Sequence, residues 1–132
     1  MAHTNEEKLS QFGRVLDVMC KLREKCPWNA AQTMESLRPM TLEEAYELSD
    51  AILKKSESDI EKELGDVLLH VVFYSRIAEE RGEFDIADVM DRLCEKMIFR
   101  HPHVFSDTEV ADAKEVSENW EMIKTKEKGG NK

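Results

Sequence analysis

The chain has 132 residues, of which 41% are hydrophobic and 36% are charged, and its net charge is −9. This apolar content suits one ordinary core and excludes a disordered chain. The acidic balance excludes a general binder of nucleic-acid polymers, which needs a basic face to release counterions. It does not exclude a phosphorylated small molecule, because divalent cations can screen carboxylates.

The chain carries no sign of membrane insertion or export. No apolar run approaches the ~20 residues of a membrane span, and the polar start MAHTNEEKLS lacks a secretory signal. Cys20, Cys26 and Cys94 have neither disulfide-like nor zinc-like spacing and indicate reduced thiols. We therefore expect a cytoplasmic protein without a membrane partner, with one domain over residues 1–126 and a flexible tail at 127–132.

The first predicted helix covers roughly residues 5–25. Its apolar residues recur at helical spacing and form one stripe, namely Leu9, Phe12, Leu16, Met19 and Leu22. Pro27 ends this helix, because proline cannot continue the hydrogen-bond ladder. A loop is expected from there through Pro39.

The second predicted helix runs from Thr41 to about Lys55, since Thr41 and Glu44 have the spacing of a capping box. A tight connection follows at residues 56–58. Ser58 then opens a third helix by the same spacing, and this helix runs to about residue 81. Gly82 is the expected C-terminal cap.

The centre of the third helix, residues 67–74, reads VLLHVVFY and is apolar on nearly every face. Such a helix is buried all round, and a short chain has few helices to surround it, so we expect part of it to lie in a subunit interface. A fourth helix is expected over 85–100 and a fifth over about 109–126. The predicted fold is an all-α bundle of four to five helices that assembles as a homo-oligomer, a dimer or a tetramer.

Two acidic pairs lie on consecutive predicted helices. Residues three apart share a helix face, so Glu44 projects with Glu47 and Glu63 projects with Asp66. The short connection predicts an antiparallel hairpin in which the two pairs face each other. Four converging carboxylates repel unless cations or protons neutralise them, and hard oxygen ligands favour Mg²⁺, with Mn²⁺ as a substitute.

Other interpretations of the same residues remain open. In a chain with 28 acidic residues the two pairs can be solvated surface charge. A di-iron bundle needs E-x-x-H pairs, whereas these sequences read EAYE and ELGD. His70 is expected to be a buried packing residue that borders the site. Gly65, costly inside a helix, is expected to allow close approach of the facing helix or of a ligand.

Seven motifs follow one another along the chain, namely CPW at 26–28, QT at 32–33, EEAYE at 43–47, ELGD at 63–66, VVFY at 71–74, RHPHVF at 100–105 and WEMIK at 120–124. This ordered set resembles the MazG family of all-α nucleoside triphosphate pyrophosphohydrolases. It covers the chain from about residue 10 to residue 126. Two features depart from the family pattern. Asn29 follows CPW where the family often has Asp, and this chain holds one module where some members have two in tandem.

The resemblance implies hydrolysis of a nucleoside triphosphate to the monophosphate and pyrophosphate. It implies Mg²⁺ held by Glu44, Glu47, Glu63 and Asp66. It also implies that the nucleotide is bound by Lys96, Arg100, Trp120 and Lys124. Within this scheme Glu44 and Glu47 are the candidate catalytic residues, and Glu47 is expected to lie nearest the attacking water.

Two alternatives to a broad triphosphatase remain open. The first is a narrower enzyme of the same superfamily, acting on dUTP, dCTP or phosphoribosyl-ATP. The second is a helical oligomer that binds nucleotide or metal without catalysis. No G-x-x-x-x-G-K-[ST] loop is present, so a P-loop mechanism is not expected.

Overall fold

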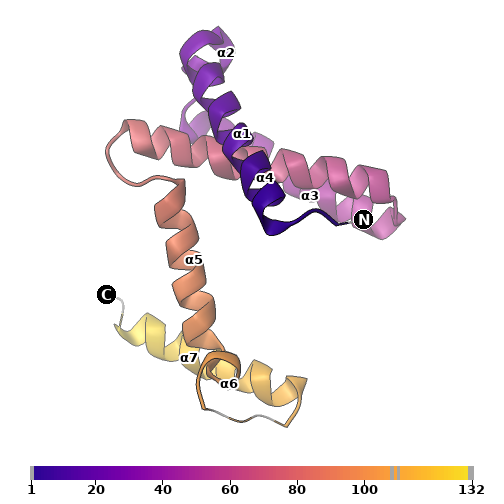
Figure 1. The fold of residues 1–132 in the computed structure, drawn as a ribbon, viewed down its shortest axis with the longest axis vertical. Coiled ribbons are helices and arrows are strands. Elements are labelled where there is room, and N and C mark those ends of the chain that lie inside the picture. Colours follow the sequence, from indigo (N-terminus) through magenta and orange to yellow (C-terminus); the bar gives the residue numbers. More distant parts are fainter. Residues whose placement is uncertain (1, 108, 110, 131–132) are drawn as a thin grey trace. The chain divides into compact units, whose positions relative to one another are not determined.

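The structure is a computed structural model that describes residues 2–107, 109 and 111–130, without the side chains of 127–130. This part of the chain is helical and contains no strand, which confirms the all-α prediction (Figure 1). Its helices are α1 (Asn5–Lys25), α2 (Pro27–Ala31), α3 (Met34–Lys54), α4 (Glu57–Glu80), α5 (Ile86–Arg100), α6 (Pro102–Phe105) and α7 (Ala113–Gly130). None of these helices combines the length and apolarity that crossing a bilayer requires. All three cysteines are free thiols.

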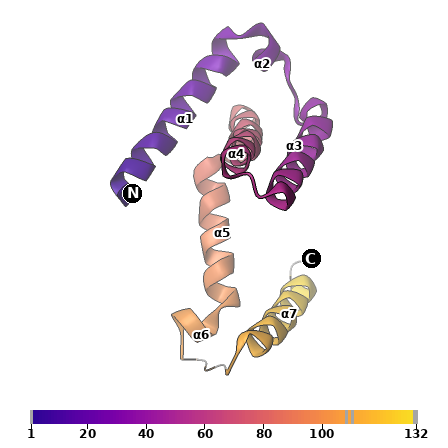
Figure 2. The same cartoon turned by 90° about the vertical axis from the view of Figure 1, so that its right-hand side faces the viewer.

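The chain divides into two compact units, Met1–Ile86 and Ala87–Lys132. In the first unit α4 lies between α1 and α3 (Figure 2). Its buried apolar core is made of Met19, Leu37, Val72, Phe73 and Ile77. The predicted α1 stripe supplies Met19 to this core, but Leu9 of the same stripe is 70% exposed.

The segment expected to be a loop before Pro39 is helical instead. Residues 27–31 form α2, and α3 begins at Met34, with Pro39 inside it. Thr33 is the N-cap of α3, where its side chain and that of Ser36 form a reciprocal capping box. Proline removes one ladder hydrogen bond, but Leu37 beside it is only 1% exposed. Core packing therefore outweighs the local penalty, which sequence spacing cannot reveal.

The connection between α3 and α4 is shorter than predicted. Lys55 ends α3 in the left-handed conformation (φ 56°), and the next residue, Ser56, caps α4 by accepting from the backbone N–H of Asp59. The predicted cap at Ser58 is therefore wrong by two residues. At the other end Gly82, with φ 69°, follows the last turn of α4 as predicted.

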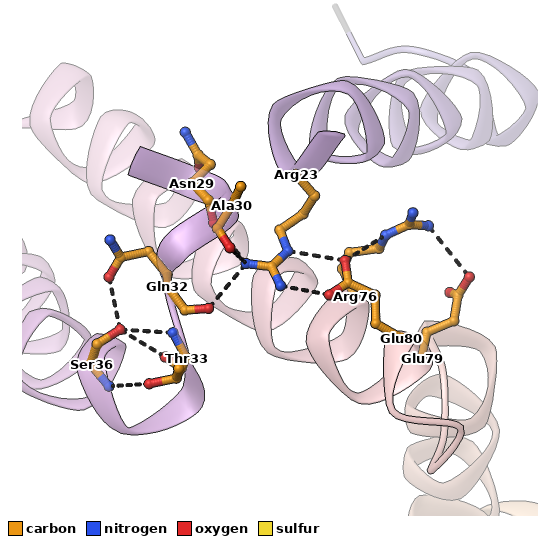
Figure 3. A network of polar contacts seen from close by, with 9 residues as sticks. All are labelled: Arg23, Asn29, Ala30, Gln32, Thr33, Ser36, Arg76, Glu79 and Glu80. Carbon is orange, nitrogen blue, oxygen red and sulfur yellow. Dashed lines mark hydrogen bonds and ion pairs between the residues drawn. The ribbon is translucent and has the colours of Figure 1, made fainter. Parts of the chain in front are cut away.

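Arg23 connects α1 to α4, to α2 and to the residue that follows α2 (Figure 3). Its guanidinium donates to the Asn29 carbonyl at 2.7 Å and to the Gln32 carbonyl at 3.0 Å. It also pairs with Glu80 through two nitrogens, at 2.5 Å and 3.0 Å. The network fixes the exit from α2 and hence the start of α3.

The second unit contains most of α5, together with α6 and α7. The short α6 was not expected, because the prediction ended with a stop at Pro102, which instead occupies the first helical position. Helix α7 starts at Ala113, after the predicted start near 109, and the Asp112 carboxylate accepts from the Glu115 N–H at its N-terminus. The expected tail at 127–132 overlaps helical backbone as far as Gly130, and residues 131–132 lie outside the described residues.

Candidate functional site

The turn at Lys55 folds α3 and α4 into an antiparallel pair. Thr41, well before the turn, reaches residues 70 and 74, well after it. The same register brings acidic side chains from both helices together. One carboxylate oxygen from each of Glu44, Glu63 and Asp66 lies within 4.8 Å of the others, and among the described residues these form a group able to hold a metal ion.

Glu47 lies beside this group and not inside it. Its side chain is exposed, and it faces Glu63 closely enough that partial desolvation and the charge of Glu63 raise the pKa of Glu47. The predicted set of four acids is therefore arranged as three clustered carboxylates with the fourth at the edge.

Two oxygens of the cluster, Glu44 Oε2 and Glu63 Oε2, are buried and have no hydrogen-bond partner in the described part of the chain. Glu63 is only 8% exposed. Burial raises the pKa of Glu44 to about 7, and the negative charges of Asp66, Glu47 and Glu63 add to this effect. An unpaired buried carboxylate is costly, so the cluster is short of positive charge.

These features fit a hard divalent cation. Mg²⁺ takes oxygen ligands from carboxylates, and the three clustered acids offer only such donors. Oε2 of Glu44 and Oε2 of Glu63 have no hydrogen-bond partner among the described residues, and a cation would supply the positive charge that they lack. The donor set also suits Mn²⁺, and it contains none of the histidine ligands that a di-iron bundle requires.

One cation is already present at the cluster, the ammonium of Lys62. Its Nζ lies 3.0 Å from Oε1 of Glu63 and 3.3 Å from Oδ2 of Asp66. These two carboxylates raise the pKa of Lys62 through hydrogen bonds and charge. We did not predict this residue as part of the site, although the i, i+4 spacing of Lys62 and Asp66 is a visible signal for the contact.

Thr41 has a different role from the predicted helix cap. Thr41 lies inside α3, and its Oγ1 contacts the Leu37 carbonyl at 3.1 Å, His70 Nδ1 at 2.6 Å and Tyr74 Oη at 2.5 Å. His70 is 8% exposed, which confirms its predicted burial. Desolvation lowers the pKa of His70, so the ring is a neutral, hydrogen-bonded part of the α3–α4 interface.

Gly65 does not serve close packing between the helices. A Cβ atom built at this position meets nothing within 4 Å. The expectation that Gly65 lets the facing helix approach is therefore wrong, and the space next to Gly65 is open. A ligand at this place stays a prediction.

The second unit gathers three of the four predicted nucleotide-binding residues. The Arg100 guanidinium carbon lies 5.6 Å from the centre of the Trp120 ring, and Lys124 Nζ lies 4.7 Å from it. Trp120 Nε1 is buried and finds no hydrogen-bond partner among the residues that the structure describes. Lys96 lies one helical turn before Arg100 on α5 and is exposed. These residues and the acidic cluster belong to different units.

The sequence matches known proteins along most of its length. The model of the MazG nucleotide pyrophosphohydrolase domain matches residues 32–105, which include the acidic cluster, Lys96 and Arg100. A nucleoside triphosphate pyrophosphohydrolase of Escherichia coli K12 is 43% identical over 91% of this chain and 47% of its own length. A protein of Thermotoga maritima, named nucleoside triphosphate pyrophosphohydrolase/pyrophosphatase MazG, is 50% identical over 92% of this chain and 47% of its own length. The chain thus spans about half the length of these curated relatives.

A solved structure has the same fold. The crystal structure of a MazG-related protein from Thermotoga maritima superposes with a TM-score of 0.72, covering 86% of this chain and 98% of that one at 24% identity. The family match covers more than half of the chain and contains all four acids of the α3–α4 pair. This chain belongs to the MazG nucleotide pyrophosphohydrolase domain family.

Proposed function

We propose that this chain hydrolyses nucleoside triphosphates to the monophosphate and pyrophosphate in the presence of Mg²⁺, for which Mn²⁺ can substitute. Glu44, Glu63 and Asp66 would hold the metal, with Glu47 as the fourth acid. The observation that carries the proposal is the buried, unpartnered Oε2 of Glu63 inside a carboxylate cluster, in a chain of this family.

The residues of the chain have distinct tasks in this proposal. When bound, the metal supplies the positive charge that phosphoryl transfer to water requires. Glu44, Glu63 and Asp66 direct oxygens at the site. Glu47 is exposed at the edge of the cluster with a raised pKa, and this combination suits a group that accepts the proton of the attacking water.

The cationic residues of the second unit would bind the nucleotide. Lys96 and Arg100 are i, i+4 neighbours on α5 and can meet one phosphate group, Arg100 with bidentate geometry. Trp120 offers an aromatic ring for the base, and Lys124 lies over that ring.

We further propose that the protein works as a homo-oligomer in the cytoplasm. Leu64, Leu68 and Val71 on α4 are 52%, 39% and 40% exposed and recur at helical spacing. An exposed apolar stripe of this kind favours a second copy of the chain as its cover. The free cysteines suit a reducing compartment.

The decisive experiment is a pyrophosphate-release assay across standard and damaged nucleoside triphosphates, with Mg²⁺ and with EDTA. We expect activity only with metal and a loss of about 100-fold or more in Asp66→Asn, because the site contributes several kcal/mol of charge stabilisation. Glu47→Gln should lower kcat by a larger factor than the factor by which it weakens metal binding. The control is Glu61→Gln, an exposed acid on α4 outside the cluster, which should retain wild-type rates.

Each alternative predicts a different result. Full activity in both Asp66→Asn and Glu47→Gln would overturn the site assignment. Activity confined to one triphosphate would favour the narrower pyrophosphatase. Binding of Mg²⁺ and nucleotide without release of pyrophosphate would favour the non-catalytic oligomer.

A further inference from the structure

The position of Lys62 is unusual for a surface lysine. Its side chain is 67% exposed, yet its ammonium contacts both Glu63, whose side chain is only 10% exposed, and Asp66. These are two of the three residues whose oxygens lie within 4.8 Å of one another. The ammonium thus sits against the same carboxylates that the divalent cation would use.

One ammonium only partly neutralises this cluster. Lys62 engages Oε1 of Glu63, while Oε2 of the same carboxylate and Oε2 of Glu44 remain buried and unpartnered. A single positive charge therefore faces several carboxylates. A divalent cation carries twice the charge and binds oxygens at about 2.0–2.1 Å, closer than an ammonium can.

The ammonium and a divalent cation cannot occupy the same carboxylate cluster without cost. Two cations a few ångströms apart repel each other, and the long, flexible stem of a lysine allows its charged end to move into solvent. Because the Lys62 side chain is 67% exposed, its ammonium is free to move into solvent.

We propose that Lys62 is an internal counter-ion that holds Glu63 and Asp66 together in the metal-free protein and is displaced when the divalent cation binds. Lys62 is therefore a positioning residue that stabilises the empty site and lowers its apparent metal affinity. This inference rests on the proposed function, because it needs the cluster to be the metal site.

The test measures metal affinity and metal-free stability, and it does not depend on turnover. In Lys62→Met we expect Mg²⁺ and Mn²⁺ to bind about 2- to 5-fold more tightly by titration calorimetry, since the two contacts of an exposed ammonium contribute at most about 1 kcal/mol in total. The melting temperature in EDTA should fall, and saturating Mg²⁺ should restore it to the wild-type value. Lys62→Arg keeps the charge and should show wild-type affinity.

Lys54→Met is the matched control. Lys54 is also 67% exposed and also pairs with an acid one turn away, Asp50 at 2.8 Å, but outside the cluster. Removing its charge changes the net charge equally and should leave metal affinity unchanged. Affinity that is unaltered or weaker in Lys62→Met, or equally tightened in Lys54→Met, would overturn the inference. If the wild-type protein binds no metal and Asp66→Asn changes nothing, the proposed function itself fails.

Discussion

The hydroxyl of Thr41 on α3 lies 2.6 Å from Nδ1 of His70 on α4. Because the neighbouring Leu37 carbonyl can only accept, the single hydroxyl proton of Thr41 goes to it. His70 Nδ1–H and the Tyr74 hydroxyl then both donate to Thr41. The Thr41 hydroxyl thus makes three hydrogen bonds, and those to His70 and Tyr74 help to fix the register of α3 against α4.

We predict that Thr41→Val destabilises the fold by about 1–3 kcal/mol, because it leaves the partners of the hydroxyl unpaired in a half-buried place. Chemical denaturation measures this change. Thr41→Ser keeps the hydroxyl and should cost less. The same geometry predicts that neutral His70 carries its proton on Nδ1, which ¹⁵N NMR can read, and a proton on Nε2 would contradict the assignment of donors.

The guanidinium of Arg23 makes a second testable contact set. Arg23→Met removes charge-assisted hydrogen bonds to the Asn29 and Gln32 carbonyls and to Glu80. We expect a loss of about 2–3 kcal/mol, a value kept below that of a fully buried pair because the Glu80 side chain is 35% exposed.

Arg76→Met is the control for Arg23. Arg76 lies on the same network (Figure 3), but its contacts to Glu79 and Glu80 are both 3.4 Å and stay within α4. Its loss should cost about 0.2–0.5 kcal/mol. Equal losses of stability in Arg23→Met and Arg76→Met would show that the hydrogen bonds from Arg23 to the Asn29 and Gln32 carbonyls contribute nothing.

Gly65 offers a gain of stability. Since an added Cβ meets nothing within 4 Å, Gly65→Ala should stabilise the metal-free protein by about 0.5–1 kcal/mol through better helix propensity. Thermal melting in EDTA tests this. Lower pyrophosphate release in a more stable variant would indicate that substrate uses the open space, whereas destabilisation in EDTA would contradict the open geometry.

The metal-free protein should lose stability as pH rises toward neutrality. The pKa of Glu44 is about 7 in the folded protein, against 4.5 for an ordinary glutamate, so the fold favours its neutral form. The stabilisation is fully present below pH 4.5 and is lost as pH rises through 7. The denaturation free energy of the wild type minus that of Glu44→Gln, measured in EDTA from pH 4 to 8.5, should fall across this window. A flat difference would be incompatible with the burial of Glu44.

A substitution in the exposed apolar stripe on α4 tests whether the protein forms an oligomer. Leu68→Glu places a charge in the middle of Leu64, Leu68 and Val71, so we expect it to convert an oligomer to a monomer in light scattering. Leu9→Glu alters a residue on α1 that is 70% exposed and should leave the mass unchanged. A wild-type chain that is monomeric at tens of micromolar would exclude this proposal.

Local spacing was informative where helices and their faces are concerned. The two E-x-x-[ED] pairs, the short connection and the buried His70 could all be anticipated, because residues three apart share a face and short connections produce antiparallel helices. Spacing was misleading at Thr41 and Ser58, which have capping-box patterns but lie inside helices. A capping pattern indicates only that a helix could begin at that residue. The burial of neighbouring residues such as Leu37 decides where the helix does begin.

Residue types and periodicity alone therefore establish an all-helical chain with acidic pairs on two consecutive helices, since these properties depend on neighbours within a turn or two. Three features needed the folded structure: the burial of Glu63 Oε2 without a partner among the described residues, the position of Glu47 outside the three clustered carboxylates, and the contacts of Thr41 on α3 with His70 and Tyr74 on α4. Each depends on which atoms from distant parts of the chain share one small volume, and therefore on desolvation and charge at distances that no spacing rule contains.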